Sequence, residues 1–99
     1  MSQVYKLFLF HRYTEAWHAL SDIEQKQLSE KVDQALEQVG GKRLVLCDTG
    51  WSSETILGFG VEVFPDVDAV QKHSTLLQEL NWLRYVDTMS VIGTEFEGN

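Results

Sequence analysis

The chain has 99 residues, about the length of one small domain, with 43% hydrophobic and 23% charged residues. This composition excludes wholesale disorder, and no apolar run approaches the roughly 20 residues that a membrane-spanning helix needs. The formal net charge of −7 repels phosphate backbones and anionic lipid, so we expect neither nucleic acid nor a membrane as a partner. We predict one domain over residues 1–99.

Cysteine usage and the N-terminal residues favour a reducing compartment. Cys47 is the only cysteine, so no disulfide can form within the chain. Residues 1–5 lack a basic segment followed by a long apolar stretch, so no signal peptide is expected. We therefore predict a cytoplasmic protein.

The first half of the chain predicts a strand followed by a helix. Val4–Arg12 is rich in aromatic and aliphatic residues without a turn residue, which is typical of a strand. Thr14–Leu20 predicts a short helix. Ser21 and Glu24 then match a capping box, and apolar residues at helical spacing continue to Val39. Glycines at positions 40 and 41 end this amphipathic helix.

The second half predicts two strands, a helix and a final strand. Lys42–Asp48 and Thr55–Phe64 read as strands joined by a turn. Asp66 is the expected N-cap of the next helix, which carries His73 on its apolar stripe. Val86–Phe96 is the last predicted strand.

The order β-α-β-β-α-β predicts an α+β, ferredoxin-like fold: a four-stranded antiparallel sheet with two helices on one face. The strands are apolar on both sides, since Leu7 and Leu9 point one way while Phe8 and Phe10 point the other. The face without helices would be a large exposed apolar patch. We therefore expect a homodimer packed sheet to sheet; the alternative is a monomer whose loops cover that face.

One stretch resembles a known superfamily. In Gly60–His73 a strand, a Phe-Pro-Asp break and a helix with Ala69 and then His73 follow one another. This pattern resembles the dimeric α+β barrel superfamily, which includes antibiotic-biosynthesis-monooxygenase-like, EthD-like, NIPSNAP-like and YCII-like proteins. The resemblance implies a dimer and a pocket between sheet and helices, but it implies no single activity, because members range from cofactor-free oxygenases to proteins of unknown role.

The topology gathers aromatic residues at one end of the predicted molecule. Strands one and two end there, and strands three and four begin there. Aromatic walls with a few polar groups are typical of small-molecule pockets. We therefore predict substrate-binding residues in this set: Tyr13, Trp17, Trp51, Trp82 and Arg84.

His11 and His73 are the predicted catalytic residues, because a histidine has a pKa suited to general acid–base work near neutral pH. We expect His73 to be partly accessible to a cleft between the second helix and the sheet. The structural alternatives are a backbone-bonded His11 and a satisfied core His73. Trp17 and Trp82 can equally be packing residues, and the two arginines at this end, Arg12 and Arg84, can pair with acidic neighbours. No metal-ligand or nucleotide motif is present, so we expect no metal and no cofactor.

Two functional hypotheses follow from these features. The first is a small cofactor-free enzyme that oxygenates, cyclises or isomerises an apolar or aromatic small molecule. The second is a non-enzymatic dimeric binding or interaction module. A pocket beside His73 would favour the first, and a filled core around it would favour the second.

Overall fold

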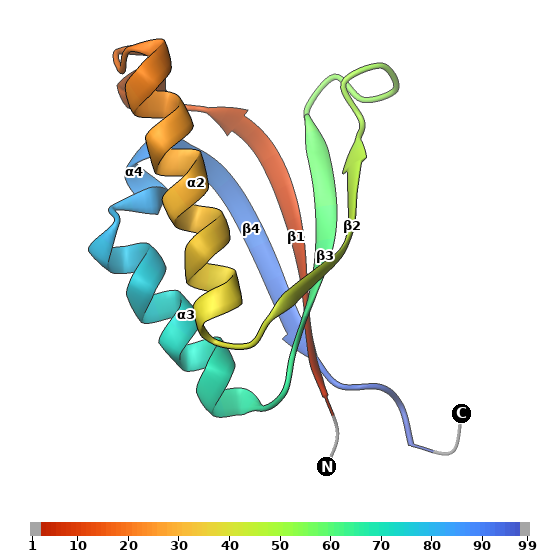
Figure 1. The fold of residues 1–99 in the computed structure, drawn as a ribbon. Coiled ribbons are helices and arrows are strands. Elements are labelled where there is room, and N and C mark those ends of the chain that lie inside the picture. Colours follow the sequence, from red (N-terminus) through yellow and green to blue (C-terminus); the bar gives the residue numbers. More distant parts are fainter. Residues whose placement is uncertain (1–2, 98–99) are drawn as a thin grey trace.

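The computed structural model describes residues 3–97 and places every helix on one face of a four-stranded antiparallel sheet (Figure 1). The strand order across the sheet is β2-β3-β1-β4. The predicted α+β, ferredoxin-like fold is therefore confirmed. The elements are β1 (Val4–Tyr13), α1 (Glu15–His18), α2 (Asp22–Gln38), β2 (Lys42–Asp48), β3 (Gly58–Phe64), α3 (Val67–Glu79), α4 (Trp82–Tyr85) and β4 (Val86–Gly93).

Local signals set the helix ends where the sequence predicts them. The Ser21 hydroxyl accepts from the Glu24 backbone N–H while the Glu24 carboxylate accepts from the Ser21 N–H, which completes the capping box at α2. Gly40 takes a φ of +77° after α2, and the Gly41 N–H donates to the Leu36 carbonyl. This is a Schellman ending, which favours glycine because of the left-handed backbone. At α3 the Asp66 carboxylate accepts from Ala69.

Two predicted strands are too long. The strand predicted over Thr55–Phe64 begins only at Gly58, because Thr49 bonds the carbonyls of residues 56 and 57 and closes the preceding loop. The strand predicted over Val86–Phe96 ends at Gly93, because β1 offers no partner beyond Tyr5, which pairs with Gly93. The helix α4 was not predicted from the sequence.

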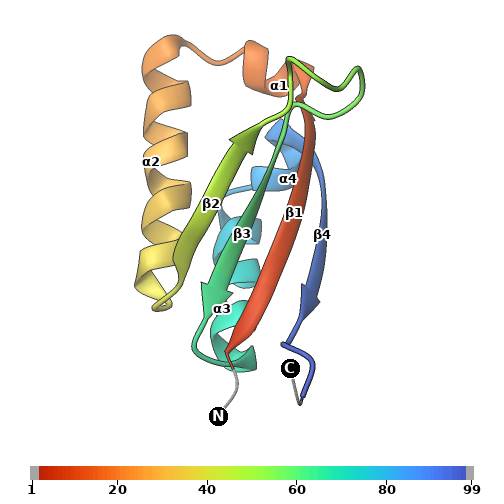
Figure 2. The ribbon, with the colours of Figure 1, turned by 90° about the vertical axis from the view of Figure 1, so that its right-hand side faces the viewer.

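The register divides the sheet into two faces of different character. On the helix-covered face, the side chains of Lys6 and Phe8 lie beside Glu62 and Gly60 of β3. The other face, called the open face here, is turned toward the viewer in Figure 2. Its central and edge strands present these apolar side chains: Leu7, Leu9, Val45, Phe59, Val61, Met89 and Val91. Both faces are thus apolar, as the alternation of leucine and phenylalanine in β1 predicts.

The core lies at the lower end of Figure 1, where α2 and α3 approach the sheet. Phe64 is 1% exposed and packs in a cluster with Val4 of β1, Leu36 of α2 and two residues of α3, Ala69 and Val70. Toward the other end, two leucines of β2 that face the helices, Leu44 and Leu46, are 56% and 61% exposed. The helices therefore cover the sheet only in part. None of the helices within residues 3–97 has both the length and the apolar character needed to cross a membrane.

Gly60 provides a test of this packing. A Cβ built at Gly60 would lie 2.5 Å from the Phe8 ring and 3.0 Å from the Val45 carbonyl oxygen, so Phe8 occupies the space that a side chain would take. We expect Gly60→Ala to lower the free energy of unfolding by about 1–3 kcal/mol through overpacking. Ser74→Ala is the control, because Ser74 is exposed on α3. Urea unfolding at one fixed protein concentration measures both, and equal stability of the two variants would contradict the packing described.

Candidate functional site

His73 is the less exposed of the two buried titratable residues on the helix-covered side of the sheet, His73 and Glu62. It lies on α3 with 2% of its surface exposed, and its ring centroid is 5.2 Å from that of Phe64. Its Nδ1 atom has no hydrogen-bond partner among the described residues. The prediction that His73 is partly accessible to a cleft is wrong, because α3 packs this residue directly on the core ring of Phe64.

Four charged side chains form an ionic cluster on the helix-covered face, next to the core. Arg43 of β2 donates to Asp33 of α2 at 3.2 Å and to Glu62 of β3 at 3.4 Å. Lys6 of β1 pairs in register with Glu62, which is 4% exposed. A buried carboxylate is costly unless cations stay close, and here two cations on neighbouring strands compensate it.

The pKa shifts in this region follow from burial and from the two cations. Burial, together with the positive charges of Lys6 and Arg43, lowers the pKa of His73 to about 4. Burial also raises the pKa of Glu62, which Lys6 and Arg43 partly offset, and burial lowers the pKa of Lys6. His73 is therefore neutral at pH 7, with one ring nitrogen able to donate and one able to accept.

The predicted aromatic end exists, but its rings pack against one another. Tyr13 stacks on Trp17 with centroids 4.4 Å apart, and Trp17 meets Trp82 edge to face at 6.1 Å. Phe10 contacts Tyr13 at 4.8 Å, and Trp17 is 7% exposed. Three of the five predicted substrate-binding residues are thus brought together. They join α1 to α4, as packing residues would.

The other two predicted binding residues lie apart from this aromatic cluster. Trp51 is 84% exposed in the loop between β2 and β3, and its indole N–H donates to the Asp48 carbonyl at 3.0 Å. Arg84 is an exposed residue of α4, with its guanidinium carbon 6.0 Å from the Tyr85 ring centroid. A ligand role for either residue stays a prediction.

The two predicted catalytic histidines do not share a site. His11 lies at the register shift of β1, between Phe10 and Arg12. The Arg12 guanidinium pairs with Asp87 at 3.4 Å, as the sequence allowed. Val4 belongs to the core cluster that contains Phe64, the ring on which His73 packs. The seven residues from Val4 to His11 extend over ~23 Å at the usual strand rise. His11 and His73 therefore act separately or not at all.

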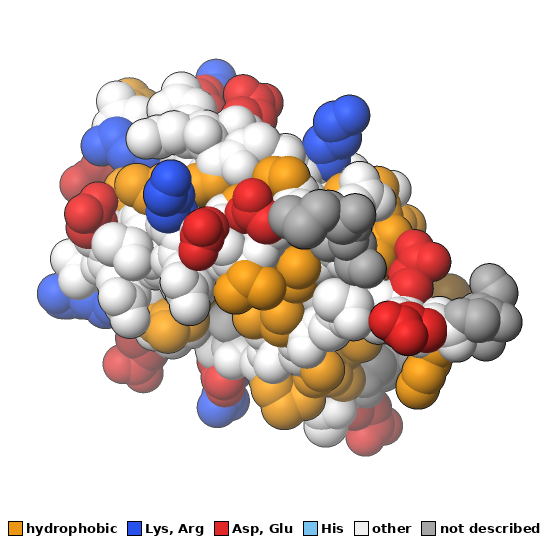
Figure 3. All heavy atoms as spheres, turned by 90° about the horizontal axis from the view of Figure 1, so that it is seen from below, with side chains coloured by type: hydrophobic (Ala, Val, Ile, Leu, Met, Phe, Trp, Pro, Cys, Tyr) orange, Lys and Arg blue, Asp and Glu red, His pale blue; other side chains and the backbone are white. Residues whose placement is uncertain are grey.

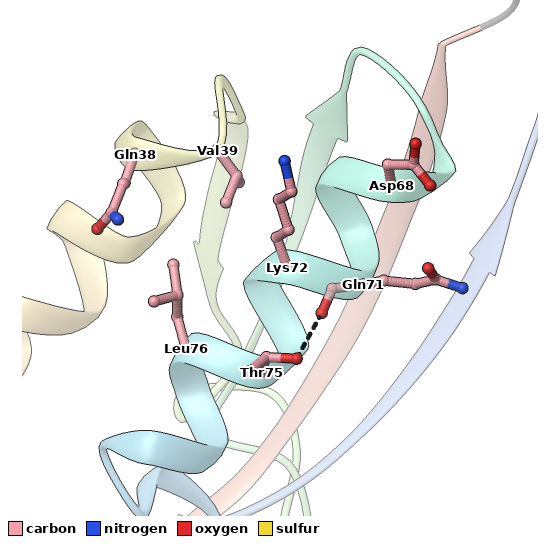
Figure 4. Close-up of a pocket in the computed structure, with 7 residues that line it drawn as sticks. All are labelled: Gln38, Val39, Asp68, Gln71, Lys72, Thr75 and Leu76. Carbon is pink, nitrogen blue, oxygen red and sulfur yellow. Dashed lines mark hydrogen bonds between the residues drawn. The ribbon is translucent and has the colours of Figure 1, made fainter.

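Two of the surface hollows formed by residues 3–97 are well defined, and neither is lined by a predicted site residue. One, of about 480 Å³, lies between α2 and α3 (Figure 4) and is lined by Gln38, Val39, Asp68, Gln71, Lys72, Thr75 and Leu76. The other, of about 380 Å³, lies on the open face. Within residues 3–97, no three histidine, cysteine or carboxylate side chains gather as metal ligands would.

The site residues predicted from the sequence did not include Lys6, Asp33, Arg43 or Glu62. The sequence did contain a signal for this cluster. At two-residue spacing, Lys6 shares a strand face with Phe8 and Phe10, and Glu62 shares one with Gly60 and Phe64. Opposite charges in otherwise apolar strands often pair across a sheet. Only the strand order shows that these two strands are neighbours.

The comparisons with known proteins support the fold. No protein-family model and no curated protein matches the chain. The fold is similar to that of a dabb family protein from Mesorhizobium loti, at a TM-score of 0.63 and 12% identity over 97% of this chain and 99% of that one. The ferredoxin-like fold that the predicted resemblance implies is thus shared with this solved structure.

Two further solved structures share the architecture. SnoaB, a cofactor-independent oxygenase from Streptomyces nogalater, is similar at a TM-score of 0.63 and 13% identity over all of both chains. A dimeric ferredoxin-like protein of unknown function from Thermobifida fusca is similar at a TM-score of 0.51 and 14% identity, over 95% of this chain and 92% of that one. At such identities the likeness concerns the fold alone.

His73 makes stability depend on pH in a defined direction. The pKa of His73 is about 4 in the folded chain, against an ordinary value of 6.5. Between pH 6.5 and pH 4, His73 therefore binds a proton in the unfolded chain but not in the folded chain. The stabilisation is present above pH 6.5 and is lost as the pH falls toward 4. We expect wild type to lose about 1–2 kcal/mol relative to His73→Gln between pH 7 and pH 4.5.

Urea titrations of both proteins at several pH values and one protein concentration measure this difference. Comparing the two proteins removes the opposite contribution of Glu62, whose raised pKa favours the folded state as the pH falls. His18→Gln is the control, because His18 is exposed. A wild-type curve parallel to that of His73→Gln would show that His73 takes up its proton normally in the folded state.

Proposed function

We propose that this protein is a homodimer, joined through the open faces of its sheets, which binds a small and largely apolar molecule on the helix-covered side of each sheet. His73 is the group that would hold or move a proton on that molecule. The observation that carries the proposal is the buried His73 ring with an unpaired Nδ1 beside the ionic cluster. Perturbed titratable groups of this kind gather at functional sites.

The apolar open face supports the homodimer. On this face, β1, β2 and β4 present apolar side chains that are 40–58% exposed in the single chain: Leu7, Val45, Met89 and Val91. Water contact of so many neighbouring apolar side chains is unfavourable, and a second copy of the same face would remove it. Two of the similar solved structures are described as dimeric ferredoxin-like proteins, which fits this assembly.

The partly covered inner side supports a ligand site there. Leu44 and Leu46 of β2 are more than half exposed on this side, and Phe8 and Phe10 of β1 are half-buried. Further along the same strands come the ionic cluster and then the core. A largely apolar ligand with one polar group would find an apolar wall and, next to it, the ionic cluster.

Two classes of activity remain as hypotheses for this site. A cofactor-free enzyme is favoured by a neutral histidine able to take a proton, and SnoaB, of the same fold, is described as a cofactor-independent oxygenase. A non-enzymatic binding or interaction module is favoured by the sealed position of His73, since α3 would have to move before a ligand reached Nδ1. We place the protein in the cytoplasm because it has a single cysteine.

A charge on the open face tests the assembly. Wild type at micromolar concentration is expected to scatter light as a particle of twice 11.4 kDa. Leu7→Glu places two like charges in the joined faces, so we expect the dimer dissociation constant to rise at least 100-fold. Leu83→Glu is the control, because Leu83 is 67% exposed on α4, away from the open face. A monomeric wild type would refute the homodimer.

Replacement of His73 tests the ligand site. A set of small aromatic and quinone-like compounds is screened for saturable quenching of tryptophan emission. We expect His73→Leu to remain folded and dimeric but to bind an identified compound at least tenfold more weakly, because the one polar group of α3 facing the core is removed. His18→Leu should bind normally. Unchanged affinity in His73→Leu would remove His73 from the site, and Trp51→Phe tests the exposed loop tryptophan in the same assay.

A further inference from the structure

The C-terminal segment 94–97 carries an aromatic side chain that contacts little of its own chain. Phe96 is 85% exposed, the most exposed of the large hydrophobic residues in residues 3–97. The segment leaves β4 at Gly93 and runs off the open-face side of the sheet, at the lower right of Figure 1. A hydrogen bond of 2.6 Å from the Tyr5 hydroxyl to Glu95 holds its base.

The open face is hollowed where this segment begins. The hollow of about 380 Å³ is lined by Tyr5, Leu7, Val61, Val91, Gly93, Thr94 and Glu95. Its floor is apolar, and two residues of the segment itself form part of its rim. Figure 3, which views the molecule from this end, shows hydrophobic side chains exposed among acidic ones.

The reach of the segment matches the distance between two packed sheets. Phe96 is three residues beyond Gly93, and an extended chain covers ~10 Å in three residues. Sheets that pack face to face lie about 10 Å apart. A segment that leaves its own sheet on the open-face side therefore brings Phe96 to the level of a partner's sheet.

The charges on this row of the sheet are self-complementary. Lys42 of β2, Val63 of β3, Tyr5 of β1 and Gly93 of β4 follow one another across the open face. The row thus begins with a lysine that forms no ion pair within residues 3–97 and ends at a segment that carries Glu95 and Glu97. A two-fold axis that runs parallel to the strands would reverse this row in the partner and set the acidic end of each copy against the basic end of the other.

We propose that the two copies exchange their C-terminal segments: Phe96 of each protomer fills the hollow on the open face of the other, and the acidic residues beside it face Lys42. The inference rests on the proposed homodimer and adds to it the anchor residue and its receptor. Two-fold symmetry makes each contact occur twice, so one substitution removes two anchors.

The first experiment measures the dimer dissociation constant by sedimentation. Phe96→Ser is expected to raise it at least tenfold, whereas Leu83→Ser, which removes another exposed hydrophobic residue, should change it less than twofold. Lys42→Glu should raise it as well. An unchanged constant in Phe96→Ser would overturn the exchange while leaving the homodimer in place; a monomeric wild type would overturn both.

The second experiment traps the exchanged segment. In a Cys47→Ser background, one copy carries Phe96→Cys and the other Val61→Cys, and the two are mixed under mild oxidation. We expect a disulfide-linked heterodimer, because a disulfide forms only where the two Cα atoms come within about 7 Å. Phe96→Cys mixed with Leu83→Cys is the control. No more linkage than in this control, from a protein shown to be dimeric, would overturn the exchange.

Discussion

Apolar side chains on both faces of one thin sheet impose the constraint on which this structure depends. In β1, Phe8 and Phe10 point toward the helices while Leu7 and Leu9 point away, and the neighbouring strands repeat the pattern. The helices cover only one face, so the other stays open in the single chain. A small domain that buries limited surface by itself would gain stability from a partner on that face, as in the proposed homodimer.

The helix-covered side of the sheet has a second constraint, because a buried charge there needs a partner of opposite sign. Glu62 lies almost fully buried between the apolar core and the more open part of the sheet, held by Arg43 and beside Lys6. A well-packed hydrophobic residue at this place would serve stability at least as well, since buried ion pairs recover their desolvation cost only in part. The proposed ligand site gives the ionic cluster and the unpaired His73 nitrogen a role other than stability.

The proposed assembly and the proposed site use opposite faces of the same strands. β1 contributes Leu7 to the open face and Lys6 to the ionic cluster, one residue apart. Any shift of β1 in the proposed dimer would therefore move side chains on both faces of the sheet. The C-terminal segment adds a link at the lower end of the sheet, where Tyr5 holds Glu95. This arrangement lets a second copy complete the fold without closing the inner side.

The sequence by itself determined the elements and their apolar faces, because these depend on residues close together in the chain. The capping box at Ser21, the glycine ending of α2 and the two-residue alternation in β1 are local signals, and each predicted the structure correctly. Strand ends were less predictable, since β4 stops where its partner stops. Only the tertiary structure decided that Lys6, Glu62 and Arg43 meet, that His73 is sealed against Phe64, and that Trp51 lies apart from the other indoles. These contacts depend on strand order and on how closely each helix packs on the sheet, which no local pattern encodes.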